Sequence, residues 1–326
     1  MSQASPQQPL RVGQSTSAPP LRVGTRASRL ATAQSGLVAA RITELTGRPT
    51  ELVTISTEGD RSTAPLTDFG GQGVFVSALR EALVAGQVDV AVHSLKDIPT
   101  APDPAVVLAA IPVREDPRDV VVARDGLTLG ELPVGSTVAT GSPRRAAQLN
   151  ALGLGVEIVP IRGNVDTRIG RVSEGVVDAV VLARAGLARL GRVDEATEVL
   201  DPIQMLPAPG QGALACECRA NDVTVITLLA EHLDDSATRA AVTAERSLLS
   251  TLEAGCSAPV GALADIALGD DGDELWLRAV VGDVSGAPTI RMSMTGSPDD
   301  AAGIGERLAA EMLAEGAAFL MKEAAS

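Results

Sequence analysis

Short apolar segments with the pattern of strands alternate with amphipathic helices along most of this chain, and this alternation limits the fold more than any other feature. Such an order is typical of α/β domains with parallel sheets. In the first part of the chain we expect strands over 21–25, 50–56 and 88–95 and helices over 28–45 and 74–86. In the next part we expect strands over 119–124, 136–142, 156–163 and 176–183, with helices over 142–153 and 164–175.

Two segments rich in Pro, Gly or charge, 113–117 and 202–212, interrupt the pattern. Beyond residue 232 it changes to a long helix over 236–255, antiparallel-looking strands over 273–282 and 289–296, and a final helix over 299–323. The sequence therefore predicts two α/β domains and a smaller C-terminal α+β domain. The expected division is a disordered tail (1–19), a first domain (20–113 with 211–231), a second domain (114–210) and a third (232–326).

Charge and composition narrow the possible ligands. The net charge of −14 disfavours nucleic acid, and four aromatic side chains in 326 residues are too few for a base-stacking surface. The stretch 144–189 nevertheless holds seven arginines and four acids, which indicates a local anionic ligand. No apolar run reaches the length of a membrane span, and residues 1–20 lack the pattern of a signal peptide. We expect a cytoplasmic protein.

Three arginine-bearing motifs each join a strand to the start of a helix: "TRAS" (25–28), "GSPRR" (141–145) and "RGNVDTR" (162–168). Free backbone N–H groups and the positive end of the helix favour anions at such turns. Arginine adds forked donors suited to carboxylate or phosphate. The residues expected to bind an anion here are Arg26, Arg144, Arg145, Arg162 and Arg168.

The motif "AVHSLKDIP" ends a strand with Lys96 followed by Asp97. The pair could be a surface ion pair, or Asp97 could handle protons in a cleft. We expect His93 to pack within the strand. Cys216 and Cys218 fall on the same side of a strand and are expected to be small buried side chains.

The third cysteine, Cys256, lies among small residues in "EAGCSAPVGA" after the long helix. The carboxyl end of a helix disfavours a thiolate, so local structure alone predicts an unreactive loop cysteine. Three cysteines without paired spacing do not indicate a disulfide framework.

Taken together, the motifs resemble the porphobilinogen deaminase (hydroxymethylbilane synthase) family. The resemblance covers roughly residues 20–265 and is carried by "LRVGTRASRLA", "GGQGVFVSAL", "AVHSLKDIP", "REDPRDVVV", "GSPRRAAQL", "RGNVDTR", "PAPGQGALACECR", "TAERSLL" and "EAGCSAPVGA", in the family's order.

The resemblance implies a transferase of tetrapyrrole and haem biosynthesis with a dipyrromethane cofactor, which the enzyme makes itself and holds through a thioether to Cys256. Four porphobilinogen molecules are added head to tail with loss of ammonia, and hydrolysis by water releases hydroxymethylbilane. Loss of ammonia leaves a cationic azafulvene, whose charge and protons Asp97 would handle. The expected protein is a monomer that hands its product to the next enzyme of the pathway.

The resemblance also implies roles for individual residues. Asp97 and Lys96 are the catalytic pair, and both also contact the cofactor together with Ser28 and the arginines of the second domain. The residues expected to hold cofactor or substrate carboxylates are Arg26, Ser28, Lys96, Ser142, Arg144, Arg145, Arg162 and Arg168, with Phe75, Arg114 and Arg189 as further substrate contacts. No metal is expected. Because seven arginines in 144–189 cannot pair every carboxylate of a six-ring chain, the chain must shift or its outer rings must reach solvent.

The sequence departs from the family pattern where family members often carry lysines. The segment here is "PLTDFGGQGVF", with Asp68 and Gln72 in place of cations.

Two other functional classes stay open. The α/β domains look like the periplasmic-binding type, so the chain could be a solute receptor, although it lacks an export signal. A thiol hydrolase using Cys256 is the other, although no His lies near it in sequence.

Overall fold

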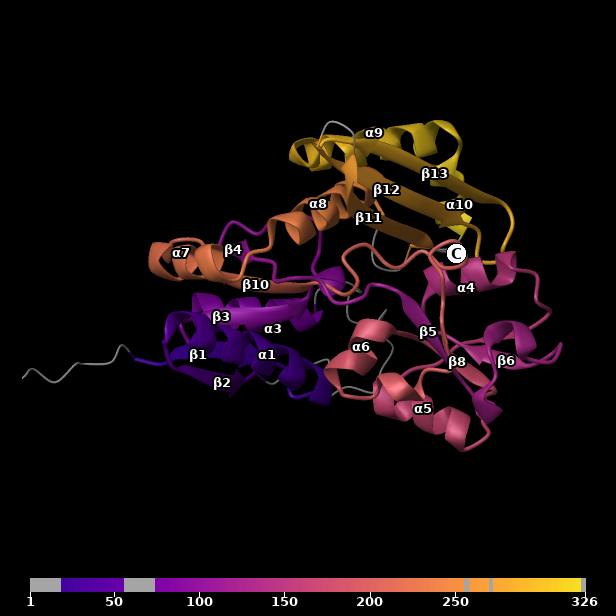
Figure 1. The fold of residues 1–326 in the computed structure, drawn as a ribbon, viewed down its shortest axis with the longest axis horizontal. Coiled ribbons are helices and arrows are strands. Elements are labelled where there is room, and N and C mark those ends of the chain that lie inside the picture. Colours follow the sequence, from indigo (N-terminus) through magenta and orange to yellow (C-terminus); the bar gives the residue numbers. More distant parts are fainter. Residues whose placement is uncertain (1–18, 56–73, 255–257, 270–271, 324–326) are drawn as a thin grey trace, which may run out of the picture.

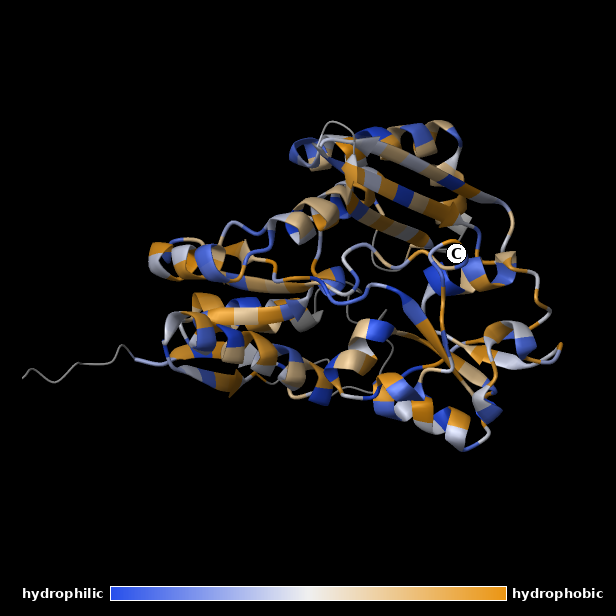
Figure 2. Ribbon diagram, in the orientation of Figure 1, coloured by the Kyte–Doolittle hydropathy of each residue, from blue (hydrophilic) through white to orange (hydrophobic). Residues whose placement is uncertain are grey.

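Three β-sheets organise the chain in the computed structural model, which describes residues 19–55, 74–254, 258–269 and 272–323 (Figure 1). The first sheet lies beside the second, and the third covers both from one side (Figure 1). Figure 2 shows many apolar residues along the strands and both apolar and polar residues on the helices around them. Buried apolar side chains form a core in each of the three parts.

The first sheet has the strand order β2-β1-β3-β10-β4. Strands β1 to β3 run parallel, and β10 runs antiparallel to both β3 and β4. Helices α1 and α7 cover one face, and α3 and α8 contribute to the other. The bounds are β1 Leu21–Thr25, α1 Arg29–Thr46, β2 Thr50–Thr54, α3 Val74–Val84, β3 Val90–Ser94, β4 Val106–Ala110, β10 Leu214–Arg219 and α7 Val223–His232.

The second sheet repeats this arrangement with the order β7-β6-β8-β5-β9. Strands β6, β7 and β8 are parallel, while β5 runs antiparallel to β8 and β9. Helix α4 covers one face, and α5 and α6 cover the other. The bounds are β5 Asp119–Ala123, β6 Thr137–Ala139, α4 Pro143–Ala151, β7 Glu157–Val159, α5 Val165–Ser173, β8 Ala179–Ala183, α6 Arg184–Arg189 and β9 Glu198–Val199.

The third sheet is an antiparallel meander, β11-β12-β13, with helices α8, α9 and α10 packed on one face. Its other face meets the second part of the chain, where Leu263 and Val280 contact Leu206. The bounds are α8 Ser236–Thr251, β11 Val260–Gly269, β12 Gly272–Gly282, β13 Thr289–Gly296, α9 Ala301–Ala314 and α10 Ala317–Glu323.

The predicted fold class, two α/β parts and a smaller C-terminal α+β part, is confirmed by these sheets. Three details differ. The α/β sheets are mixed, because β5 and β10 run against their neighbours. The final helix is broken, since Gly316 adopts a left-handed φ of 97° between α9 and α10. Helix α8 ends at Thr251, four residues earlier than expected.

The chain passes between the first two sheets twice, from β4 to β5 and from β9 to β10. In each sheet the antiparallel strand is the one that follows a crossing. The interrupting segments 113–117 and 202–212 lie within these crossings. We propose that they are the domain boundaries and the hinges. Among the described residues, none of the helices combines the length and apolarity needed to cross a bilayer.

Candidate functional site

A cavity of about 230 Å³ lies where the three parts of the chain meet. The first part contributes Lys96 and Asp97, and the third contributes Leu249 and Ala258. The second part contributes Gly141, Ser142, Arg144, Arg145 and Arg168, and the crossing from β9 to β10 contributes Ala208, Pro209 and Gln211. Four cationic side chains and one carboxylate, Asp97, therefore line a small volume, which favours an anionic ligand.

The strand-to-helix turns form as the sequence predicts. Ser142 caps α4, with its Oγ accepting from the Arg145 N–H, and Pro143 follows as the first helical residue. Asn164 caps α5 through the Thr167 N–H, and Ser28 caps α1 through the Ala31 N–H. Each cap starts its helix at the carboxyl end of a strand, so the positive helix ends lie where anions bind.

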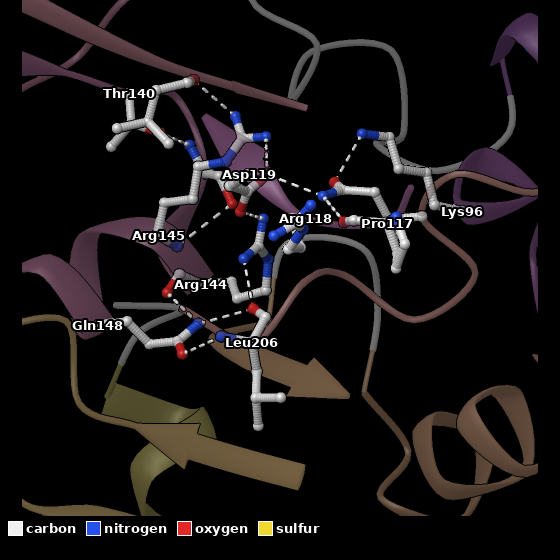
Figure 3. Close-up of polar contacts among 12 residues, drawn as sticks. Lys96, Pro117, Arg118, Asp119, Thr140, Arg144, Arg145, Gln148 and Leu206 are labelled. Atoms are coloured by element: carbon white, nitrogen blue, oxygen red, sulfur yellow. Dashed lines mark hydrogen bonds and ion pairs between the residues drawn. The ribbon is translucent and has the colours of Figure 1, made fainter. Parts of the chain in front are cut away.

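Asp119, the first residue of β5, is fully buried between the two arginines of α4 (Figure 3). Its Oδ2 lies 2.8 Å from Arg144 Nη2, and its Oδ1 lies 2.7 Å from Arg145 Nη2. Burial disfavours the carboxylate, but the two guanidinium groups outweigh it and hold the pKa of Asp119 well below its ordinary range. The arginines are thereby fixed, since Arg144 Nη1 also donates to Leu206 O and Arg145 Nη1 to Val181 O.

Lys96 and Asp97 belong to a short 3₁₀ turn, Leu95–Asp97, directly after β3. The Lys96 ammonium donates to Gln211 Oε1 at 3.1 Å, and burial lowers the pKa of Lys96 to about 8. Asp97 is exposed on the cavity lining. Arg246 of α8 stabilises the end of this turn by donating to Ile98 O at 3.0 Å and to Pro99 O at 2.8 Å.

The structure brings Lys96, Asp97, Ser142, Arg144, Arg145 and Arg168 to the cavity. Arg168 donates from Nε to Gly163 O, and burial lowers its pKa. Ser28, Arg26 and exposed Arg162 are not among the residues that line it. Cys256, Asp68 and Gln72 lie outside the described residues, and so does the side chain of Phe75.

Arg114 and Arg189 line a different cavity of about 470 Å³, beside the crossing from β4 to β5. Arg114 donates to both carboxylate oxygens of buried Glu245, at 2.7 and 3.0 Å. Arg189 donates to Gly212 O, and burial lowers its pKa. Both arginines therefore contact the crossings themselves rather than the cavity with Lys96 and Asp97.

His93 and two of the cysteines lie in the first sheet. His93 is packed within β3, as predicted, with Nε2 lying 3.4 Å from Glu217 Oε2. Cys216 and Cys218 are buried on β10, as predicted, and burial raises their pKa values to about 12 and about 11. No cluster of three potential metal ligands occurs in the part of the chain that the structure describes.

Sequence reasoning missed Asp119, Gln211 and Glu245. Each was inside a motif, but its role depends on partners far away in sequence, such as Arg144 for Asp119 and Gly210 for Glu245. One signal was available: an acid at the start of the apolar run "DVVVA" must find cations when the strand is buried.

The residues that line the cavity fit a polycarboxylate ligand. The Nε atoms of Arg144 and Arg145 are buried and have no hydrogen-bond partner among the described residues, so two donors remain for a ligand. Ala258, which lines the cavity, follows Cys256 by two residues.

Comparisons with known proteins match most of the sequence. Residues 21–227 match the family model described as "Porphobilinogen deaminase, dipyromethane cofactor binding domain", and residues 239–314 match "Porphobilinogen deaminase, C-terminal domain". The chain is 61% identical over 306 residues to the porphobilinogen deaminase of Mycobacterium tuberculosis strain H37Rv, covering 92% of this chain and 98% of that protein. It is 57% identical over 320 residues to that of Nocardia farcinica, covering 97% of this chain and 92% of the relative.

Among solved structures, the methionine binding protein MetQ matches with a TM-score of 0.42 and 14% identity, covering 65% of this chain and 89% of MetQ. The BvgS VFT2 domain of Bordetella pertussis matches with a TM-score of 0.41 and 16% identity, covering 65% of this chain and 85% of that domain. The sequence matches, by contrast, extend across all three sheets, and this chain belongs to the porphobilinogen deaminase family.

Proposed function

We propose that the protein is a hydroxymethylbilane synthase. It joins four porphobilinogen molecules head to tail, releases one ammonia for each, and frees the linear tetrapyrrole by hydrolysis. The observation that carries this proposal is the cavity in which Lys96 and Asp97 of the first part face Arg144, Arg145 and Arg168 of the second. A substrate with two carboxylates and one reacting aminomethyl group needs such a separation of charge: cations for its arms and one carboxylate at the reacting carbon.

The dipyrromethane cofactor would be anchored at Cys256 and held by the cavity cations. When bound, it supplies the nucleophilic pyrrole carbon to which the first substrate is joined. Arg144, Arg145 and Ser142 are placed to bind its carboxylate arms, because their donors surround the start of α4. Charge-assisted hydrogen bonds of this kind contribute about 1.5–3 kcal/mol each.

Asp97 stabilises positive charge on the reacting substrate. As the bond between the aminomethyl carbon and its protonated nitrogen breaks, the nitrogen leaves as ammonia with the bonding electrons, and the positive charge passes to the substrate pyrrole. The Asp97 carboxylate stabilises this charge. The nucleophilic pyrrole carbon would lose its proton once it is joined to the substrate, and Asp97 is the carboxylate on the cavity lining that could accept this proton.

The arginines of the flanking turns extend the proposal beyond the cavity. Arg26 and Ser28 at the start of α1, and Arg162 before α5, would hold substrate or product arms, and Phe75 would be a further substrate contact. Arg114 and Arg189, at the crossings, would respond to the movement of the first part against the second as the chain lengthens. We further propose that the protein acts as a cytoplasmic monomer, uses water in the release step, and passes its product to the next enzyme.

The stoichiometry of the reaction tests the proposed function. Purified protein is supplied with porphobilinogen, and ammonia and linear tetrapyrrole are measured in the same sample. We expect four ammonia molecules for each tetrapyrrole. Substrate that is bound but not consumed would instead make the protein a receptor, and ammonia without tetrapyrrole would make it a deaminating hydrolase.

A further inference from the structure

We propose that Gln211 is a positioning residue that holds the Lys96 ammonium at the cavity and couples it to the buried Asp119. The inference deepens the proposed function, because Lys96 is one of the cations that would bind substrate. Gln211 lies in the return crossing from β9 to β10, and its side chain is buried. It therefore connects the first part of the chain to the second at a hinge.

The contacts of Gln211 fix which way its amide group faces. Nε2 lies 2.7 Å from Pro117 O and 2.8 Å from Asp119 Oδ1, and both of these atoms can only accept. The amide nitrogen must therefore face them, which turns Oε1 toward Lys96 Nζ at 3.1 Å. Figure 3 labels the three residues that this amide group contacts, Lys96, Pro117 and Asp119.

The choice of a neutral partner has a consequence for Lys96. A carboxylate at this position would form an ion pair with the ammonium and compete with a substrate carboxylate for it. An amide oxygen orients the ammonium and favours its charged form without adding a negative charge at this position. Glutamine can contact groups of opposite charge, because its amide oxygen accepts from the Lys96 ammonium and its amide nitrogen donates to Asp119. Asp119 must stay ionised between two arginines.

Besides the hydrogen bond to Gln211, burial and several charged groups affect the pKa of Lys96. Burial lowers its pKa to about 8; Asp97 and Asp119 oppose this change, and Arg144 and Arg145 add to it. Arg168 lines the same cavity from α5. Loss of the amide oxygen removes one group that favours the ammonium, so the pKa of Lys96 should fall further. A carboxylate in its place should raise it.

The chain offers an unusually direct test, because Lys96 and Lys322 are its only lysines. Trace acetylation with acetic anhydride at a series of alkaline pH values, followed by peptide mass mapping, measures the pKa of each lysine in the unmodified protein. The variants are Gln211→Met and Gln211→Glu. The matched control is Gln204→Met, an exposed glutamine in the same crossing.

We expect the pKa of Lys96 to fall by about one in Gln211→Met and to rise in Gln211→Glu. Lys322 should be unchanged in both, and Gln204→Met should match the wild type. A general loosening of the fold would move Lys96 in the same direction in both variants. That result, or an unchanged Lys96 in both, overturns the proposal.

The kinetic prediction is separate. KM for porphobilinogen should rise about tenfold in Gln211→Met, with a smaller effect on kcat, and the alkaline limb of kcat/KM should move to lower pH. An unchanged KM and pH profile would show that Gln211 does not position Lys96 for substrate. If the wild type does not consume porphobilinogen, the proposed function fails, while the labelling result still decides whether Gln211 controls Lys96.

Discussion

Arg114 and Glu245 form a two-point ion pair that joins the crossing after β4 to helix α8. Arg114 Nη1 lies 2.7 Å from Glu245 Oε1, and Nη2 lies 3.0 Å from Oε2. The same carboxylate accepts from the N–H groups of Gly210 and Ala264, so one buried side chain joins both crossings to the third sheet. Helix α8, which carries Glu245, ends at Thr251. Cys256 follows in the sequence and lies outside the described residues.

Replacement of Glu245 should therefore destabilise the protein strongly. In Glu245→Gln an amide NH₂ group faces donors that the carboxylate accepted, and the Arg114 charge is left without its partner. We expect the free energy of unfolding to fall by about 3–5 kcal/mol in urea titrations. Glu311→Gln, an exposed site on α9, is the control. Equal midpoints for Glu245→Gln and the control would contradict this reading of the contact.

Asp89 predicts a defined pH dependence of stability. Burial opposes its ionisation, but hydrogen bonds from Arg22 and Arg219 outweigh it and lower the pKa of Asp89 from 3.8 to about 2. Because the folded state has the lower pKa, the stabilisation is present above the unfolded value and is lost as the pH falls through the folded value. Wild type should exceed Asp89→Asn by about 2 kcal/mol near neutral pH.

This advantage should disappear as the pH falls from about 4 to about 2. Urea unfolding of both proteins across the acid range measures it. Asp273→Asn, at an exposed position on β12, controls for loss of an acid elsewhere. A difference between wild type and Asp89→Asn that stays constant with pH would show that Asp89 acts through packing and not through its charge.

Asp97 should affect the reaction without affecting the fold. Its side chain is exposed on the cavity lining, so Asp97→Asn removes a charge with little change in packing. We expect kcat to fall about 10²–10⁴-fold, with an unfolding midpoint equal to that of the wild type. Steady-state kinetics and urea unfolding on the same preparation measure both. Turnover close to wild type would make Asp97 a surface charge.

Arg246 should affect the rate of the reaction by positioning Asp97. Its guanidinium donates to the carbonyls of Ile98 and Pro99 and so fixes the turn that carries the carboxylate. We expect Arg246→Met to lower kcat about tenfold with little change in KM, and Arg246→Lys to restore part of the loss. Arg307→Met, which removes an exposed arginine of α9, is the control. An equal loss in the Lys and Met variants, or a change confined to KM, would count against a positioning role.

The strand-to-helix turns could be predicted from the sequence because their signals are local. Ser142 with Pro143, and Asn164 before α5, cap their helices through N–H groups three residues away. The broken final helix was missed because a single glycine within an Ala- and Glu-rich run does not by itself show where a helix stops.

The network around Asp119 could not be predicted because it depends on how distant strands pair. Asp119 meets the carboxyl end of β8, opposite Ala183, since β5 runs antiparallel to its neighbour. A parallel sheet, as expected from the alternating pattern, would have placed Asp119 at the opposite edge, away from α4. The positions of Arg144 and Arg145 were therefore predicted, but the acid that fixes them was not.

The mass of the denatured, freshly purified protein tests the central claim most directly. The account predicts that the wild type exceeds its polypeptide mass by a two-pyrrole group, that digestion locates the group on Cys256, and that Cys256→Ala carries none while Cys218→Ala retains it. A wild-type protein of bare polypeptide mass that nevertheless forms tetrapyrrole, or a Cys256→Ala variant that keeps the added group, would contradict it.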